Sequence, residues 1–282
     1  MVSRARRLWT VFEVVHVPVY FAPEPLAAYA ALGLRGYWRG YYAGRVAPLG
    51  AVGADPVVRY FHGFARRHVE RALPSIWELT SPAAALDARL AGVRDTLARA
   101  WAGLDDTVLV AEQLLTAAVD GADLDGRPLG SANRDVERPT DPIGGVWHAA
   151  TVLREARGDG HVTALRRHEI GPCESLVLRA GLGTPRSVLQ PNRGWTDEEW
   201  DTTADSLQAR GLLDAGGAAT DAGRQVERAV EALTDELADS PWSTLGDRRT
   251  DDAYAALSTL AEPLRAMLPW PNPMALPRPT GT

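Results

Sequence analysis

The chain has very little cysteine and no lysine. Cys173 is its one cysteine among 282 residues, so an internal disulfide is excluded. No group of Cys and His has the spacing of zinc ligands, and His62 and His68 are six residues apart instead of the four that place two ligands on one helix face. We therefore predict reduced thiols, a cytoplasmic location, and neither a metal nor a cofactor, with Cys173 buried instead of nucleophilic.

Long hydrophobic runs are also missing. No stretch approaches the ~18 uncharged apolar residues of a membrane span. The N-terminal stretch places apolar residues after basic ones, but Glu13, His16 and Pro18 interrupt it and no small-residue cleavage site follows. We expect a soluble protein that begins with a helix instead of a signal peptide and that has no membrane partner.

Basic charge comes from arginine alone, a bias typical of a GC-rich bacterial genome. Residues 1–140 contain 16 Arg and 15 acids, whereas residues 141–282 contain 14 Arg and 21 acids. A general nucleic-acid partner would favour the opposite imbalance.

Helical periodicity dominates, and almost no segment alternates as a strand would. Glycine, proline and aspartate interrupt the pattern between residues 120 and 142. The predicted fold is mainly α, with helices near 4–16, 23–32, 35–46, 55–63, 66–78, 82–101, 105–119, 142–157, 160–168, 171–181, 196–211, 221–238 and 249–267, and a small β-ribbon at 212–219.

Three domains are predicted from this pattern. They are a helical domain at 1–125, resembling a degenerate winged helix, a winged-helix domain at 140–245, and a C-terminal helix with a proline-rich tail at 246–282. Each half has about the size of one winged-helix subunit, so the chain could be a tandem winged helix, a single-chain pseudo-dimer. Trp270 and Met274 would anchor the tail if it wraps over the protein.

The phrases SLQARGLL and ATDAGRQ are similar to MarR-type winged helices. In those proteins the first phrase ends the recognition helix and the second begins the helix after the wing. Trp200, Ala204, Leu207 and Leu212 recur at helical spacing and form one apolar face. The resemblance therefore implies a recognition helix at 196–211.

The charge of this segment does not suit DNA. Eight acids and three arginines lie between Gly194 and Arg228. Acids near Thr196 favour the start of a helix, but they repel phosphates, which supply most non-specific affinity through Lys and Arg. We expect the segment not to read DNA. Another segment could contact nucleic acid instead: residues 35–71 contain seven Arg and two acids. Within it, residues 55–71 either contact nucleic acid or form a solvated basic face.

Two predicted helices combine aromatic rings with an arginine two turns away. Such faces suit a planar or carboxylated small molecule, although aromatic stripes at this spacing also form ordinary core. The candidate ligand-binding residues are Trp38, Tyr41, Tyr42 and Arg45 on one helix, and Trp147, His148, Thr151 and Arg154 on the other.

A second polar cluster follows in REARGDGH. We expect the GDG stretch to end one helix, with Asp159 capping the turn and His161 beginning the next helix. His148 or His161 could act as a general acid or base near neutral pH. No nucleophile, second carboxylate or metal ligand completes a catalytic set, so His161 is also a ligand-binding candidate.

Phrases along nearly the whole chain, including WRGYYAGRVAPLG, REARGDGH and LPWPNP, resemble an actinobacterial helix-turn-helix family. The resemblance implies a MarR-like fold and links to specialised metabolism, but no catalytic residue. The sequence thus predicts a winged-helix protein, a monomer or homodimer, that binds a small organic molecule. The alternatives are a DNA-binding regulator and a biosynthetic enzyme on the same scaffold.

Overall fold

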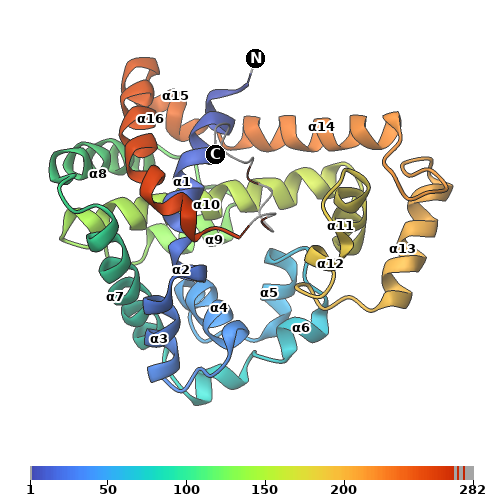
Figure 1. Ribbon diagram of the computed structural model, residues 1–282, viewed down its shortest axis with the longest axis horizontal. Helices are drawn as coiled ribbons and strands as arrows, with labels where there is room; N and C mark the ends of the chain where they lie inside the picture. Colours follow the sequence, from blue (N-terminus) through green and yellow to red (C-terminus); the bar gives the residue numbers. More distant parts are fainter. Residues whose placement is uncertain (1, 270–271, 273–275, 277–282) are drawn as a thin grey trace. The chain divides into compact units, whose positions relative to one another are not determined.

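A computed structural model describes residues 2–269, 272 and 276. The fold is mainly α, as predicted, and the described residues contain no strand (Figure 1). No helix among them is long and apolar enough to span a membrane. Trp270 and Met274, the predicted anchors of the tail, lie outside the described residues.

The chain forms two compact units, each assembled from separate segments. Among the described residues, unit 1 comprises 2–52, 72–159 and 235–269, and unit 2 comprises 53–71 and 160–234 with residues 272 and 276. Two of the limits between the units fall inside long helices, after Asp159 in α10 (Pro142–Arg167) and after Thr234 in α14 (Asp221–Leu237). The predicted domains 1–125, 140–245 and 246–282 follow the chain order instead, and they remain a prediction about which segments fold by themselves.

Unit 1 is a set of short and medium helices that pack closely. Helices α3 and α7 approach so near that a Cβ added to Gly92 would lie 2.5 Å from the Pro25 Cα. Prolines in the first turn begin several of the helices, where their missing N–H is not needed. The helices are α1 (Arg4–His16), α2 (Pro18–Phe21), α3 (Pro23–Ala31), α4 (Tyr37–Val46), α7 (Pro82–Ala100), α8 (Asp105–Asp120), α9 (Pro128–Arg134), the first part of α10 (Pro142–Arg167), α15 (Ser240–Leu245) and α16 (Asp247–Ala261).

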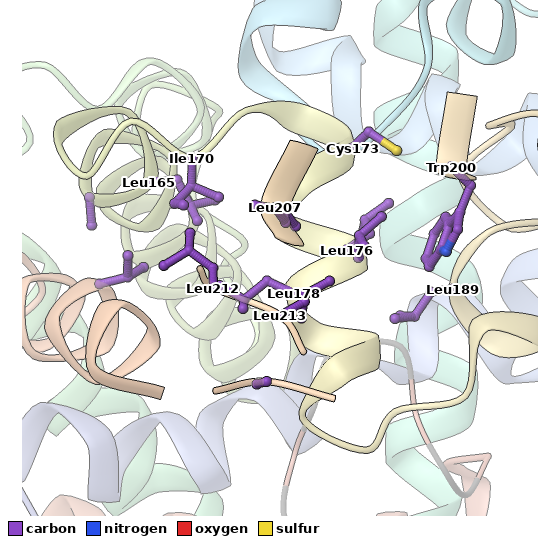
Figure 2. Close-up of a cluster of buried hydrophobic side chains, with 14 residues drawn as sticks. Leu165, Ile170, Cys173, Leu176, Leu178, Leu189, Trp200, Leu207, Leu212 and Leu213 are labelled. Carbon is purple, nitrogen blue, oxygen red and sulfur yellow. The ribbon is translucent and has the colours of Figure 1, made fainter. Parts of the chain in front are cut away.

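Unit 2 contains residues 196–211, the segment predicted as a recognition helix. Its helices are α5 (Ala54–Tyr60), α6 (Arg66–Glu70), the end of α10, α11 (Pro172–Gly181), α12 (Arg186–Leu189), α13 (Asp197–Ala209) and most of α14 (Asp221–Leu237). Figure 2 shows Trp200 and Leu207 of α13 among the buried apolar side chains of this unit, with Leu176 of α11 and Leu189 of α12. The predicted apolar face of residues 196–211 therefore packs into the core, and Cys173 is buried as predicted.

The predicted helix break at GDG is wrong, because α10 continues through it. Asp159 is buried inside α10 and caps another helix: its Oδ2 accepts hydrogen bonds from the Leu129 and Gly130 N–H groups at the start of α9, at 2.8 and 2.9 Å. Burial raises the pKa of Asp159 to about 7. A glycine inside a helix costs only about 1 kcal/mol relative to alanine, so these long-range contacts outweigh the local signal.

Three other local predictions differ from the structure. The expected ribbon at 212–219 is a turn closed by one antiparallel bridge, Leu213 to Ala219, because Asp214 Oδ1 accepts the N–H groups of Gly216 and Ala218 and holds the chain in a tight turn. The helix expected at 66–78 ends at Glu70, ahead of Pro74, which cannot continue it. Helix α9 begins at Pro128, inside the stretch 120–142 where glycine, proline and aspartate interrupt the predicted helical pattern.

Candidate ligand site in unit 1

A small cavity lies in unit 1, where helices α1, α2, α3, α4, α7 and α10 meet. Its volume is about 10 Å³, room for roughly one water molecule. It is lined by His16, Val19, Tyr20, Tyr29, Tyr41, Gly44, Arg45, Arg89 and Glu155. All of these are buried except Tyr41 and Arg45, which are half-buried, so the cavity is closest to solvent on the α4 side.

Glu155 is the centre of a buried ion-pair cluster. It receives two parallel hydrogen bonds from Arg45, 2.9 Å from Nε to Oε1 and 2.7 Å from Nη2 to Oε2. Arg154 lies 3.0 Å from the same carboxylate and 3.3 Å from Glu13. Burial by itself would raise the pKa of Glu155, but Arg154 and Arg45 outweigh it and hold that pKa at about 2. Glu155 is therefore ionised at neutral pH.

His16 forms a second network whose proton positions follow from its partners. The Thr151 hydroxyl donates to the Trp147 carbonyl, at 2.8 Å, so it accepts from His16 Nδ1, at 2.9 Å. The Nε2 atom is then free to accept the Tyr20 hydroxyl proton, at 3.0 Å. Burial, followed by the charge of Arg154, lowers the pKa of His16 well below its usual value. His16 is therefore neutral and held in one tautomer.

Arg89 is a buried cation without a carboxylate. It is 5% exposed, and among the described residues no acidic side chain lies within ion-pair distance of it. Its Nη1 donates to the Gly44 carbonyl, at 2.8 Å, and to Asn133 Oδ1, at 3.2 Å, while Nε has no hydrogen-bond partner there. The guanidinium lies over the Trp147 ring, 5.2 Å from its centroid. Burial lowers the pKa of Arg89, which is the direction expected for an uncompensated cation.

Aromatic rings cover the half-buried side of the cavity. Tyr41 accepts a hydrogen bond from Arg45 Nη1 at 2.8 Å. Trp38 packs edge-on against Tyr41, with ring centroids 5.3 Å apart. The Tyr37 ring stacks on the Tyr41 ring, with centroids 6.0 Å apart. Tyr42 is fully buried and contacts both Trp38 and Tyr41. A ligand that enters from this side would meet Tyr37, Trp38 and Tyr41 first.

Most of the predicted site residues gather in this region. Tyr41 and Arg45 line the cavity, and Trp38 and Tyr42 contact Tyr41. Three further candidates bond to lining residues: Trp147 Nε1 donates to the His16 carbonyl, Thr151 pairs with His16 Nδ1, and Arg154 pairs with Glu155. That these residues bind a ligand stays a prediction.

The two candidate histidines do not join the cavity. His148 is buried elsewhere in unit 1, where burial, followed by the charges of Arg89 and Arg138, lowers its pKa to about 4. His161 belongs to unit 2, with its Nδ1 3.1 Å from Thr234 Oγ1 and 3.7 Å from Glu231 Oε1. Neither lies among the residues that line the cavity, and a pKa near 4 does not favour His148 as a proton shuttle at neutral pH.

Sequence reasoning missed the lining residues His16 and Arg89, and also Glu13, which pairs with Arg154 beside the cavity. His16 and Glu13 are visible in the sequence as polar interruptions of an apolar helix, three residues apart and hence on one face. Arg89 stands in an otherwise small and apolar stripe of α7 with Ala85 and Val93, a position that is normally core. Polar residues at core positions were the signal that could have identified these side chains. The sequence does not show which residues they pair with, because their partners lie far away in the chain.

In unit 2, arginines neutralise much of the acidic charge on α13. Arg186 pairs with Asp197 at 2.8 Å and with Asp201 at 2.6 Å, and Arg67 pairs with Glu199. The hydrogen bonds from Arg67 lower the pKa of Glu199 to about 2. Arg67 belongs to the basic 55–71 segment, so part of the positive charge of that segment is neutralised by an acid of unit 2.

Comparison with known proteins gives one match. A family model described as a helix-turn-helix family matches residues 5–269. No curated protein and no solved structure matches the chain.

Proposed function

The chain belongs to the helix-turn-helix family, and from this premise we propose that it binds a small organic molecule in the unit 1 cavity and does not read DNA through α13. The observation that carries the proposal is the convergence of ionised, hydrogen-bonding and aromatic side chains from six helices on one cavity. Ligand sites of proteins combine aromatic walls with a few placed polar groups in this way.

The charge of α13 supports the second part of the proposal. Residues 197–209 include five acids and no basic residue, and residues 212–219 add one acid and no arginine. The arginines that neutralise three of these acids, Arg186 and Arg67, are held in ion pairs and would have to release them to contact phosphates. A reading helix of this composition lacks the phosphate contacts on which DNA affinity depends.

Native mass spectrometry of protein purified from its own cells tests ligand binding. We expect a co-purifying small molecule in the wild type. It should be lost in Val19→Leu, because the added methylene fills a cavity with room for about one water molecule. The control is Val110→Leu, at an exposed position of α8 that does not line this cavity. No bound molecule in the wild type, or one retained equally by Val19→Leu, would contradict the proposal.

Fluorescence anisotropy with a random DNA duplex at low salt tests the second part. We expect no salt-dependent binding by the wild type, because the phosphates would meet the acids of α13. Arg210→Ala and Arg224→Ala variants serve as the comparison, since these two arginines flank the turn after α13. Tight binding by the wild type that both substitutions abolish would show that this segment reads DNA after all.

The relation to MarR-type regulators and the degenerate winged helix in residues 1–125 are parts of this proposal that rest on sequence phrases. A regulator acting through residues 55–71 is the second candidate, favoured by the exposure of Arg59, Arg66 and Arg71. Binding that survives the Arg210 and Arg224 substitutions but is lost in Arg59→Ala and Arg71→Ala would favour this second candidate.

A further inference from the structure

The buried charges around the cavity do not balance. Three guanidinium groups, those of the half-buried Arg45 and Arg154 and of the buried Arg89, share two buried carboxylates, Glu155 and Glu13. Both carboxylates are within ion-pair distance of Arg45 or Arg154, which leaves Arg89 as the surplus cation.

Asp159 does not supply the missing charge. Its carboxylate accepts two backbone N–H groups at the start of α9, and its pKa of about 7 leaves it about half protonated at neutral pH. An isolated buried charge is costly unless it is paired, so the surplus on Arg89 favours an additional anion.

The free edge of Arg89 has the geometry that an acid group needs. Its Nη1 is occupied by the Gly44 carbonyl and Asn133, whereas Nε, on the edge that it shares with Nη2, has no hydrogen-bond partner among the described residues. This edge presents two parallel N–H donors, the arrangement that binds a carboxylate through both oxygens. Tyr29 lines the same cavity, and its hydroxyl can donate a further hydrogen bond to an acid group there.

Resting on the proposed function, we propose that the ligand is a carboxylic acid whose carboxylate pairs with Arg89 in the cavity. The cavity holds about one water molecule, less than a carboxylate needs, so binding requires the half-buried side chains of Tyr41 and Arg45 to move outward. The rest of the molecule therefore extends toward Tyr41 and Arg45, on the half-buried side, where the rings of Trp38 and Tyr37 provide apolar contact.

A pair of small probes of matched shape tests this inference without any substitution. In a ligand-observed NMR titration at constant ionic strength, propionate is expected to bind the full-length protein at least about tenfold more tightly than propionamide, because only the charged group forms charge-assisted hydrogen bonds. Equal binding of the two probes, or no binding of propionate, overturns the proposal.

Variants then locate the anion. Arg89→Gln is expected to reduce propionate binding to the level of propionamide binding. Arg89→Lys is expected to retain part of the propionate affinity, because lysine supplies the positive charge without the two parallel N–H donors of the guanidinium group. Tyr29→Phe gives a second, milder variant, with an expected loss of a few-fold for propionate alone. Arg265→Gln, in a surface pair with Glu262, is the control and should change nothing. Unchanged propionate binding by folded Arg89→Gln overturns the proposal.

These results distinguish a failure of the carboxylate inference from a failure of the proposed ligand binding. If propionamide binds as well as propionate and Val19→Leu weakens both, the cavity is a ligand site for neutral molecules, so this inference fails while the proposed function stands. If propionate binds more tightly than propionamide but Val19→Leu does not weaken its binding, the anion binds outside the cavity. In that case this inference and the proposed function both fail.

Discussion

Glu155→Gln is expected to lower the free energy of unfolding by about 3–5 kcal/mol. The substitution keeps the shape of the side chain but removes the negative charge between Arg45 and Arg154, at 2.7 and 3.0 Å. Both guanidinium groups are mostly buried and would then face one another with only Glu13 nearby. Removing one partner of a buried pair leaves an uncompensated charge, which costs more than the pair contributes. Urea unfolding followed by far-UV circular dichroism measures the change.

The matched control is Glu262→Gln in the same unit. Glu262 pairs with Arg265 at 3.1 Å on the surface, where its side chain is 76% exposed. Surface ion pairs contribute about 0–1 kcal/mol, so this change should stay below about 1 kcal/mol. If Glu155→Gln costs no more than Glu262→Gln, Glu155 is not the buried, ionised partner of Arg45 and Arg154 described above.

Gly92→Ala is expected to lower the free energy of unfolding by about 2 kcal/mol, although alanine is the better helix former. Its Cβ would lie 2.5 Å from the Pro25 Cα and 2.7 Å from the Pro25 nitrogen. These are backbone atoms of α3 and cannot rotate away, so α3 and α7 would have to separate. Thermal and urea unfolding of the purified variant measure the effect.

Gly158→Ala is the opposite case and serves as the control. Gly158 also lies inside a helix, α10, but nothing is within 4 Å of its added Cβ. The substitution should stabilise the protein by about 0.4–1 kcal/mol, because alanine loses less conformational entropy on folding. Equal effects of the two substitutions would contradict the close approach of α3 and α7.

Local chemistry accounts for the helices that the sequence predicted well. Helix α7 begins at Pro82 after Ser81, whose Oγ accepts the Ala84 N–H at 3.1 Å. Helix α13 begins after Thr196, whose Oγ1 accepts the Glu199 N–H, while the Glu199 carboxylate accepts the Thr196 N–H. These signals act within four residues, so a single sequence contains all of the relevant information.

The site depended on information of another kind. Trp38, Tyr41 and Arg45 stood out because aromatic and basic residues recur on one helix face. Arg89 and Glu155, in contrast, take their roles from partners 40 or more residues away: Gly44 for Arg89 and Arg45 for Glu155. Periodicity predicts which side of a helix is buried, but not which charged group lies opposite.

By itself, the sequence determined a mainly α chain, the ends of its capped helices, and the acidic character of α13, because propensity, capping and charge are properties of neighbouring residues. Only the tertiary structure decided that α10 continues through Gly158 and that Asp159 caps α9. It alone also showed that Arg89 is buried with no carboxylate within ion-pair distance among the described residues. Burial and pairing are set by contacts between distant segments, and the free energy of a charge depends on those contacts more than on the residues beside it.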